Sequence, residues 1–210
     1  PQLFLADVIV TDSRTAGEMR GNVEAGLRRL RSFQRPGGGF SYWPGGDDVN
    51  DWSTIWAGHF LVEAERAGFV SPPGMKDKWL SHMRSSARGW TNTLPGGWTN
   101  DDHQLTQAYR LYVMALANAV DIGSMNRLRT LPDLGTQARW MLAAAYAIGN
   151  RKDVAREIVQ GLATGSTPYA GMGRTFGSDL RDDAVIAEAL LRMDDRTAAE
   201  LLAAARDATL

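Results

Sequence analysis

The stretch QLTQAYRLYVMALANA, residues 104–119, decides the fold of this chain. Its apolar side chains point in every direction around a helix; they are Leu105, Ala108, Tyr109, Leu111, Tyr112, Val113, Met114 and Leu116. A helix at a protein surface keeps one polar face, whereas a helix that is apolar all round is buried. The sequence therefore predicts a helix over 104–119 that lies inside a core.

Helices of two kinds alternate on both sides of this stretch. Segments with one apolar and one charged face are predicted to be outer helices: 22–34, 76–87, 151–162 and 197–208, with a short helix around 125–131. Segments apolar nearly all round are predicted to be inner helices: 51–64, 104–119, 138–148 and 182–193. The links are short and rich in glycine and proline, and only 7–11 reads as an ambiguous strand. The pattern indicates an all-α chain of about nine helices.

Helical hairpins of this size stack either into an open solenoid or into a closed ring. An open solenoid tolerates charge on its solvated inner side, but the inner helices here are apolar and aromatic. We therefore expect an α/α toroid, with residues 1–210 as a single domain. Nine helices are too few for a full ring, and the pattern is still helical at Leu210. We expect an incomplete ring, truncated at one or both ends and cut from a longer chain.

Composition excludes several classes of function. The 210 residues carry a formal net charge of -1, so the basic surface typical of nucleic-acid binders is missing. There is no cysteine, which excludes a disulfide scaffold, a thiolate zinc site and a cysteine nucleophile within this chain. No apolar run reaches the ~20 residues of a membrane span. We predict no cofactor, no metal, no nucleic-acid partner and no membrane span.

Two glycine-rich loops precede inner helices. The first, Gly37-Gly38-Gly39-Phe40-Ser41-Tyr42-Trp43, lacks the lysine of a phosphate-binding loop. Its aromatic residues either line the mouth of the ring or tuck over the end of the core. The second loop, 169–178, either approaches another group closely or simply crosses the surface. The candidate rim residues, for shielding or for docking another domain, are Phe40, Tyr42, Trp43, Tyr169, Met172 and Phe176.

Acidic residues gather just before the inner helices: Asp47, Asp48, Asp51, Asp101, Asp102, Asp179, Asp182 and Asp183. Paired carboxylates beside tryptophans are typical of glycan-cleaving toroid enzymes. Capping of helix N-termini explains the same positions without further assumptions. Among the histidines, we expect His59 in the core and His82 in solvent, whereas His103 is either solvated or a base or ligand. No catalytic constellation emerges.

Several stretches resemble the thioester (complement-like) domain of bacterial alpha-2-macroglobulin family proteins. The resemblance follows the chain order and covers nearly all of it; it rests on 30–65, 107–113, 125–129 and 175–182. It implies an α/α toroid within a large secreted, periplasmic or envelope protein. In such a protein, a protease cleaves a bait region and an internal thioester captures that protease.

The resemblance also implies where the reactive group lies. The family's thioester forms within a Cys-x-Glu-Gln motif, which precedes a segment like 1–5 of this chain. With no cysteine here, the chain is expected to be a non-enzymatic scaffold whose partners are the other domains of the parent chain and, through them, target proteases. The alternative is an α/α-toroid glycan hydrolase or lyase that uses Asp47, Asp51 or Asp102 with Trp43 and Trp98.

Overall fold

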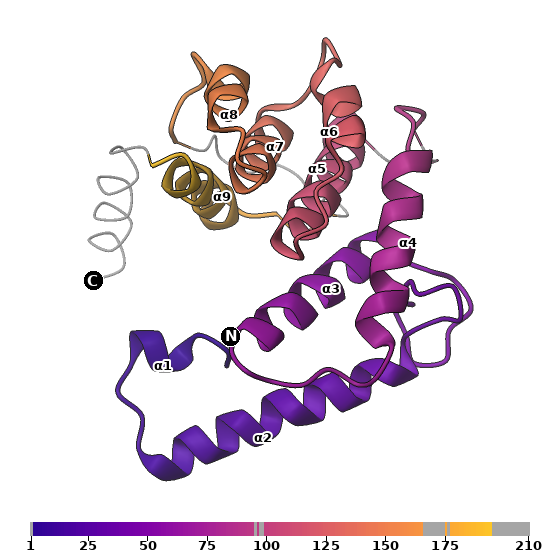
Figure 1. Ribbon diagram of the computed structural model, residues 1–210, viewed down its shortest axis with the longest axis vertical. Coiled ribbons are helices and arrows are strands. Elements are labelled where there is room, and N and C mark those ends of the chain that lie inside the picture. Colours follow the sequence, from indigo (N-terminus) through magenta and orange to yellow (C-terminus); the bar gives the residue numbers. More distant parts are fainter. Residues whose placement is uncertain (1, 95, 97–98, 166–174, 176, 195–210) are drawn as a thin grey trace. The chain divides into compact units, whose positions relative to one another are not determined.

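The computed structural model describes residues 2–94, 96, 99–165, 175 and 177–194. Within these ranges the chain forms nine α-helices, one 3-10 turn and two isolated β-bridges, Gln34 with Phe40 and Ser41 with Val49 (Figure 1). The predicted all-α architecture of helical hairpins is confirmed. None of the described helices is long and apolar enough to cross a membrane. The chain divides into two compact units, Pro1–Ser85 and Ser86–Leu210, and the single-domain assignment stays a prediction.

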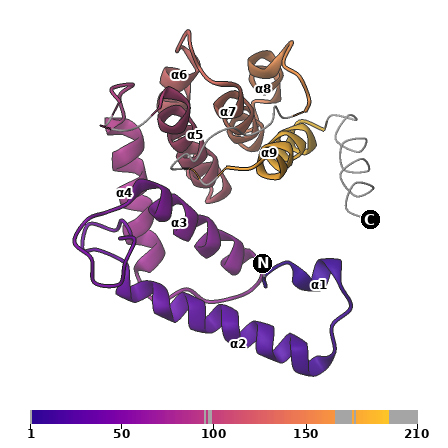
Figure 2. The ribbon, with the colours of Figure 1, turned by 180° about the vertical axis from the view of Figure 1, so that it is seen from behind.

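Unit 1 contains α1 (Leu5–Val8), α2 (Ser13–Arg29), the 3-10 turn η1 (Leu30–Ser32), α3 (Asp51–Arg66) and most of α4 (Met75–Gly89). Its core is built from one face of each long helix together with the loop before α3. The largest buried side chains are Leu27, Phe40, Ile55, Leu61, Trp79 and Met83. The link between α3 and α4 runs along α2 (Figures 1 and 2).

A glycine allows α3 and α4 to pack closely. A Cβ atom added at Gly58 would lie 1.9 Å from Cε2 of Trp79, so only glycine leaves room for that indole. The indole of Trp79 is fully buried, and its N–H donates to the carbonyl of Thr54 at 3.0 Å. The ring is therefore fixed by its burial against Gly58 and by a hydrogen bond at its edge.

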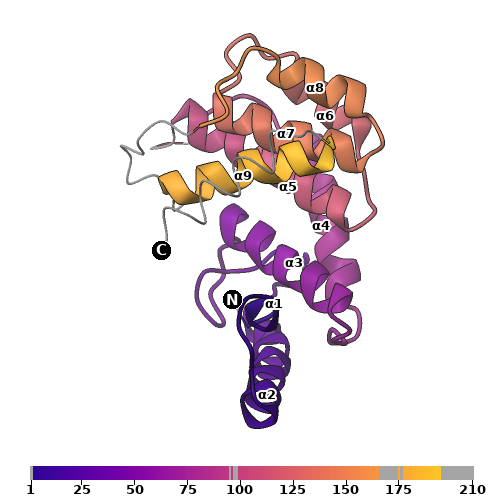
Figure 3. The same ribbon diagram turned by 90° about the vertical axis from the view of Figure 1, so that its left-hand side faces the viewer.

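Unit 2 contains α5 (Asn100–Leu116), α6 (Ile122–Arg129), α7 (Thr136–Ile148), α8 (Lys152–Val159) and α9 (Asp179–Arg192). Helix α7 lies between α5 and α9, while α6 and α8 run along the outer side of this row (Figures 1–3). Nearly every residue of α5 from His103 onward is buried, whereas α8 buries only Ala155. The predicted alternation of inner and outer helices is therefore observed in this unit.

Helices α2 and α5 start earlier than the apolar pattern predicted, whereas α3 begins at Asp51 as predicted. Helix α2 begins at Ser13 and not near residue 22, because Asp12 caps it by accepting from Thr15 N–H at 2.7 Å. Helix α5 begins at Asn100, capped by Thr99. Segment 7–11 includes the end of α1 and no strand. The helix expected over 197–208 lies outside the described residues.

The last turn of α4 belongs to unit 2. The carbonyl of Ala87 accepts hydrogen bonds from Gln107 Nε2 at 3.1 Å, Ser124 Oγ at 3.1 Å and Arg127 Nη2 at 2.9 Å. Beside it, Arg88 pairs with Asp121 at 2.8 Å. Helix C-terminal carbonyls lack partners within the helix, and here side chains from α5 and α6 supply them. The boundary between the units therefore falls inside a continuous helix.

Candidate functional site

The loop between η1 and α3 is a braced hairpin. Gly38 takes φ +94, a left-handed conformation that favours glycine, and its N–H donates to the carbonyl of Arg35 at 2.8 Å. Across this turn, Arg35 N–H donates to the Gly39 carbonyl at 2.8 Å. The Arg35 guanidinium also pairs with the Asp47 carboxylate at 3.2 Å. The backbone of the loop is thus fixed at its base and again at its far side.

Phe40 anchors the loop in the core of unit 1. It is 1% exposed, its N–H donates to Thr54 Oγ1 at 2.8 Å, and its carbonyl accepts from Asn50 N–H at 2.9 Å. Ser41 is also buried, and its hydroxyl donates to the carbonyl of Trp43 at 2.7 Å. Phe40 thus follows the second of its two expected positions, over the core, and its ring is not on the surface.

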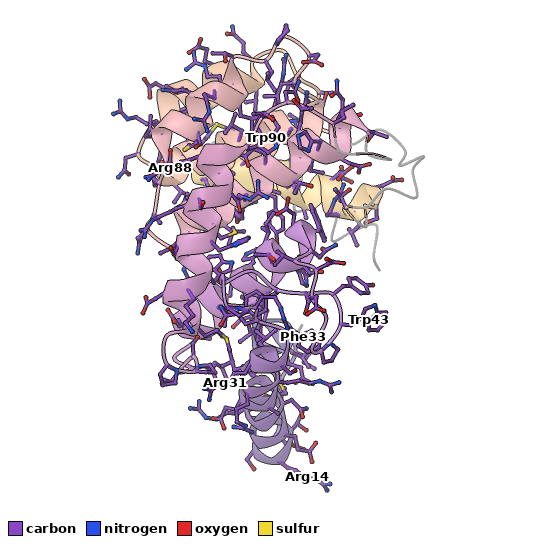
Figure 4. The ribbon with its side chains drawn as sticks, turned by 90° about the vertical axis from the view of Figure 1, so that its right-hand side faces the viewer. Arg14, Arg31, Phe33, Trp43, Arg88 and Trp90 are labelled. Carbon is purple, nitrogen blue, oxygen red and sulfur yellow. The ribbon has the colours of Figure 1, made fainter. Side chains whose placement is uncertain are left out.

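Tyr42 and Trp43 project from this braced loop. Their rings meet edge to face with centroids 5.1 Å apart, and the two residues are 51% and 71% exposed. Figure 4 shows Trp43 pointing away from the ribbon. An exposed aromatic pair on a fixed backbone presents apolar area with little conformational freedom to lose on contact. The other predicted rim residues, Tyr169, Met172 and Phe176, lie outside the described residues.

Trp56 departs from the expectation that α3 is buried on most sides. The residue is 63% exposed, and its ring meets His59 edge to face at 6.5 Å. His59 is half-buried and lies 3.9 Å from Glu63, so it is less enclosed than the core histidine we expected. Helix α3 packs in unit 1 through Thr54, Ile55, Gly58, Leu61, Val62 and Ala64.

His103 is a structural residue and not a solvated one, which corrects one of the alternatives left open. It is 9% exposed, its Nε2 lies 2.8 Å from the carbonyl of Thr91, and its ring stacks on Trp90 at 5.0 Å. Asp102 beside it accepts from Thr99 Oγ1 at 2.8 Å and from Thr175 Oγ1 at 3.2 Å. These partners give both side chains a role in fixing the start of α5.

His82 is half-buried instead of solvated, because its ring lies over the glycine turn. A Cβ added at Gly39 would come within 3.0 Å of that ring. Among the acidic residues near the inner helices, Asp182 is buried and pairs with Arg181 at 2.6 Å. Within the described part of the chain, no group of three or more metal-ligating side chains comes together.

The sequence of this chain is similar to part of two known bacterial proteins. No protein-family model matches the chain. Over 175 residues it is 29% identical to the alpha-2-macroglobulin of Xylella fastidiosa strain Temecula1, covering 78% of this chain and 10% of that protein. The alpha-2-macroglobulin of strain 9a5c matches with the same identity and coverage. The chain spans about a tenth of the length of these relatives.

Solved structures agree with these relatives. The native conformation of Escherichia coli alpha-2-macroglobulin matches 97% of this chain and 14% of its own, with a TM-score of 0.77 at 20% identity. Salmonella alpha-2-macroglobulin reacted with methylamine matches 93% of this chain and 13% of its own, with a TM-score of 0.76 at 23% identity. The fold is therefore the all-helical hairpin fold found within these large proteins. The chain is therefore similar to bacterial alpha-2-macroglobulins in sequence and matches part of their fold, which confirms the resemblance.

Proposed function

We propose that this chain is the helical thioester-type domain of a longer bacterial alpha-2-macroglobulin-like protein that traps proteases, and that it serves there as a scaffold without catalytic turnover. The observation that carries this proposal is the coverage of its relatives. A match over 78% of this chain takes up only 10% of the Xylella protein. One helical domain inside a much longer inhibitor accounts for both figures.

The described states of the structural relatives support a trapping role. One is a Salmonella protein reacted with methylamine, and others are Escherichia coli proteins activated by trypsin or by porcine elastase. Those proteins respond to an amine and to proteases. This chain has no cysteine, so any thioester in its parent forms outside residues 1–210, and these residues support the reactive segment.

The aromatic pair Tyr42 and Trp43 has a role in this proposal as a contact for another domain of the parent or as a shield over the thioester. Its exposure and its braced backbone support that role. We place the parent in the periplasm, in the cell envelope or outside the cell. Its partners are its own other domains and the proteases that it captures, with no nucleic acid involved.

The test uses the parent protein from the same gene, purified with the region upstream of Pro1. If that region encodes Cys-x-Glu-Gln, methylamine should add to the protein and release one thiol, and trypsin should become covalently attached in a complex that survives denaturing electrophoresis. Substituting the upstream cysteine by serine should abolish both results. A parent with the motif that neither gains mass nor releases a thiol would contradict the proposal.

Two further measurements separate scaffold from enzyme and test the aromatic pair. In a glycan hydrolysis screen, the present chain and its Asp102→Asn variant should both be inactive; turnover that Asp102→Asn abolishes would favour the toroid hydrolase instead. In the parent, replacing Tyr42 and Trp43 by alanine should accelerate the methylamine reaction if the rings shield the thioester. If both the rate of the methylamine reaction and the contacts between domains were unchanged, Tyr42 and Trp43 would have neither of the proposed roles.

A further inference from the structure

Unit 1 contains a pocket of about 390 Å³ between α2 and the link from α3 to α4. One wall is helical and carries Arg20, Glu24, Arg28 and, from η1, Arg31. The other wall is the extended segment 68–73, which runs beside α2 in two opposite views (Figures 1 and 2). The sequence pattern predicted Arg28 and Arg31 on the charged, solvated face of an outer helix. It could not predict the pocket, because the packing of α2 against this link is a tertiary contact.

The extended wall is held in place by its own backbone. Gly68 takes φ +83 at the end of α3, and Phe69 N–H donates to the carbonyl of Ala64 at 2.9 Å. Pro72 and Pro73 have fixed φ angles, and the Pro72 carbonyl accepts from Met75 N–H at 3.1 Å. The pocket is therefore preformed, and a ligand loses little by having to order it.

The pocket carries excess positive charge. Three arginines line it against one glutamate. Arg20 is engaged, since it lies 3.3 Å from Glu24 and 5.0 Å above the ring of Phe69. Arg28 and Arg31 have no carboxylate partner among the residues that the structure describes. In a chain with a net charge of -1, this leaves two guanidinium groups concentrated at one hollow surface.

A buried polar atom in the same pocket also lacks a partner. The hydroxyl of Ser71 is inaccessible and makes no hydrogen bond. Buried hydroxyls in folded proteins nearly always have a partner, so each exception calls for an explanation. Ser71 lines the pocket, but its hydroxyl has no accessible surface, so a ligand oxygen that entered the pocket would accept from the nearby arginines and not from this hydroxyl. The remaining lining is apolar and includes Leu27, Val70 and the two prolines.

We propose that this pocket binds a carboxylate group of an extended peptide, with an adjacent apolar side chain against Val70 and the prolines. Arginine forks match carboxylate geometry and form charge-assisted hydrogen bonds with it. A free phosphate would satisfy the charge but leave the apolar wall uncovered, so the mixed lining favours a peptide. The pocket lies within unit 1, and this inference holds whether or not the parent traps proteases.

The experiment titrates three peptides into the chain and follows the amide signals of Val70 and Ser71 by NMR. The peptides are Ac-Leu-Glu-Val-NH2, its neutral counterpart Ac-Leu-Gln-Val-NH2, and Ac-Leu-Gln-Val-OH. The first or third should bind at least tenfold more tightly than the second, and their comparison distinguishes a side-chain from a C-terminal carboxylate. Equal binding of the neutral peptide, or no binding by any peptide, would overturn the proposal.

Variants give the matched comparison. Replacing Arg28 and Arg31 by glutamine should lower the affinity for the carboxylate-bearing peptide at least tenfold and remove the salt dependence of its binding. Arg29→Gln removes a charge from the same helix outside the pocket lining and should change the affinity less than twofold. If Arg29→Gln lowered the affinity as much as the double variant, the binding would come from general charge attraction and the proposed pocket would be refuted. Inorganic phosphate that competes as strongly as the peptide would refute peptide selectivity. Because Arg28, Arg29 and Arg31 are exposed, their replacement should not disturb the fold, and thermal melts of the variants should match that of the unchanged chain.

Discussion

Asp121 shows how a single carboxylate can serve two elements at once. It caps α6 by accepting from Ser124 N–H at 3.0 Å and binds Arg88 of α4 at 2.8 Å. Partial burial raises the pKa of Asp121, but the hydrogen bonds from Ser124 and Arg88, together with the positive charge of Arg88, hold that pKa below its usual value of 3.8. A lowered pKa in the folded state means that the ionised form stabilises the fold.

Asp121→Asn separates the cap from the charge, since asparagine caps a helix as well as aspartate does. We expect a loss of roughly 1 kcal/mol of unfolding free energy at pH 7, because the pair with Arg88 loses its charge. The stabilisation is complete above the unfolded pKa of about 4 and fades as the pH falls through the folded pKa. Urea titrations from pH 7 to pH 3 should show the two proteins converging.

A suitable control is Asp12→Asn at the exposed cap of α2, where a smaller change is expected. If the difference between Asp121→Asn and the unchanged protein persisted at pH 3, the Arg88 pair would not be its source.

At the scale of helices, the contact of α3 with α4 depends on the missing side chain at Gly58. Two glycines of this chain allow a direct comparison, since both lie inside helices. Gly58 faces the buried indole of Trp79, whereas Gly21 in α2 has no atom within 4 Å of an added Cβ. The same substitution therefore acts on packing in one helix and on helix propensity alone in the other.

Gly58→Ala should destabilise the chain by about 2 kcal/mol or more, because a methyl group forces Trp79 or the helix to move. Gly21→Ala should stabilise it by about 0.5–1 kcal/mol, since alanine loses less entropy in a helix. Thermal and urea unfolding measure both changes. Destabilisation of similar size in both variants would show that the Trp79 contact is not responsible.

In unit 2 the apolar pattern predicted which helices are inner and which are outer, because the burial of α5 and α7 follows from the composition of each segment. It missed the starts of α2 and α5, since these turns are polar and are held by the caps Asp12 and Thr99. It also missed the burial of His103, which depends on Trp90 and Thr91 in another segment. At the candidate site it identified the loop, but only tertiary contacts separate buried Phe40 from exposed Trp43.

At the scale of the whole molecule, α4 is the element that both units share. Met83 and Trp79 are buried in unit 1, and Ala87 accepts three side-chain hydrogen bonds in unit 2. Because one continuous helix supplies both sets of contacts, a break in it should affect both units.

Ser85→Pro tests this at an exposed position inside α4, at the boundary between the units. Proline there removes a helix hydrogen bond and clashes with the preceding turn, so we expect a loss of about 3 kcal/mol or more. Ser13→Pro places the same residue at the first position of α2, where it is tolerated, and should change stability by less than about 0.5 kcal/mol. Hydrogen exchange should show faster opening in both units for Ser85→Pro alone; protection retained in either unit would mean that it folds without α4.

The tight approaches at glycine have a consequence for tracing ancestry. A Cβ at Gly38 would lie 2.1 Å from the Lys78 carbonyl oxygen, one at Gly39 would lie 2.6 Å from Val49, and Gly58 faces Trp79. A homologue that keeps the same packing cannot replace these three glycines by larger residues, whereas most surface positions tolerate substitution. A search pattern that requires these glycines together with a large ring at position 79 would therefore recognise distant relatives whose overall sequence identity is low.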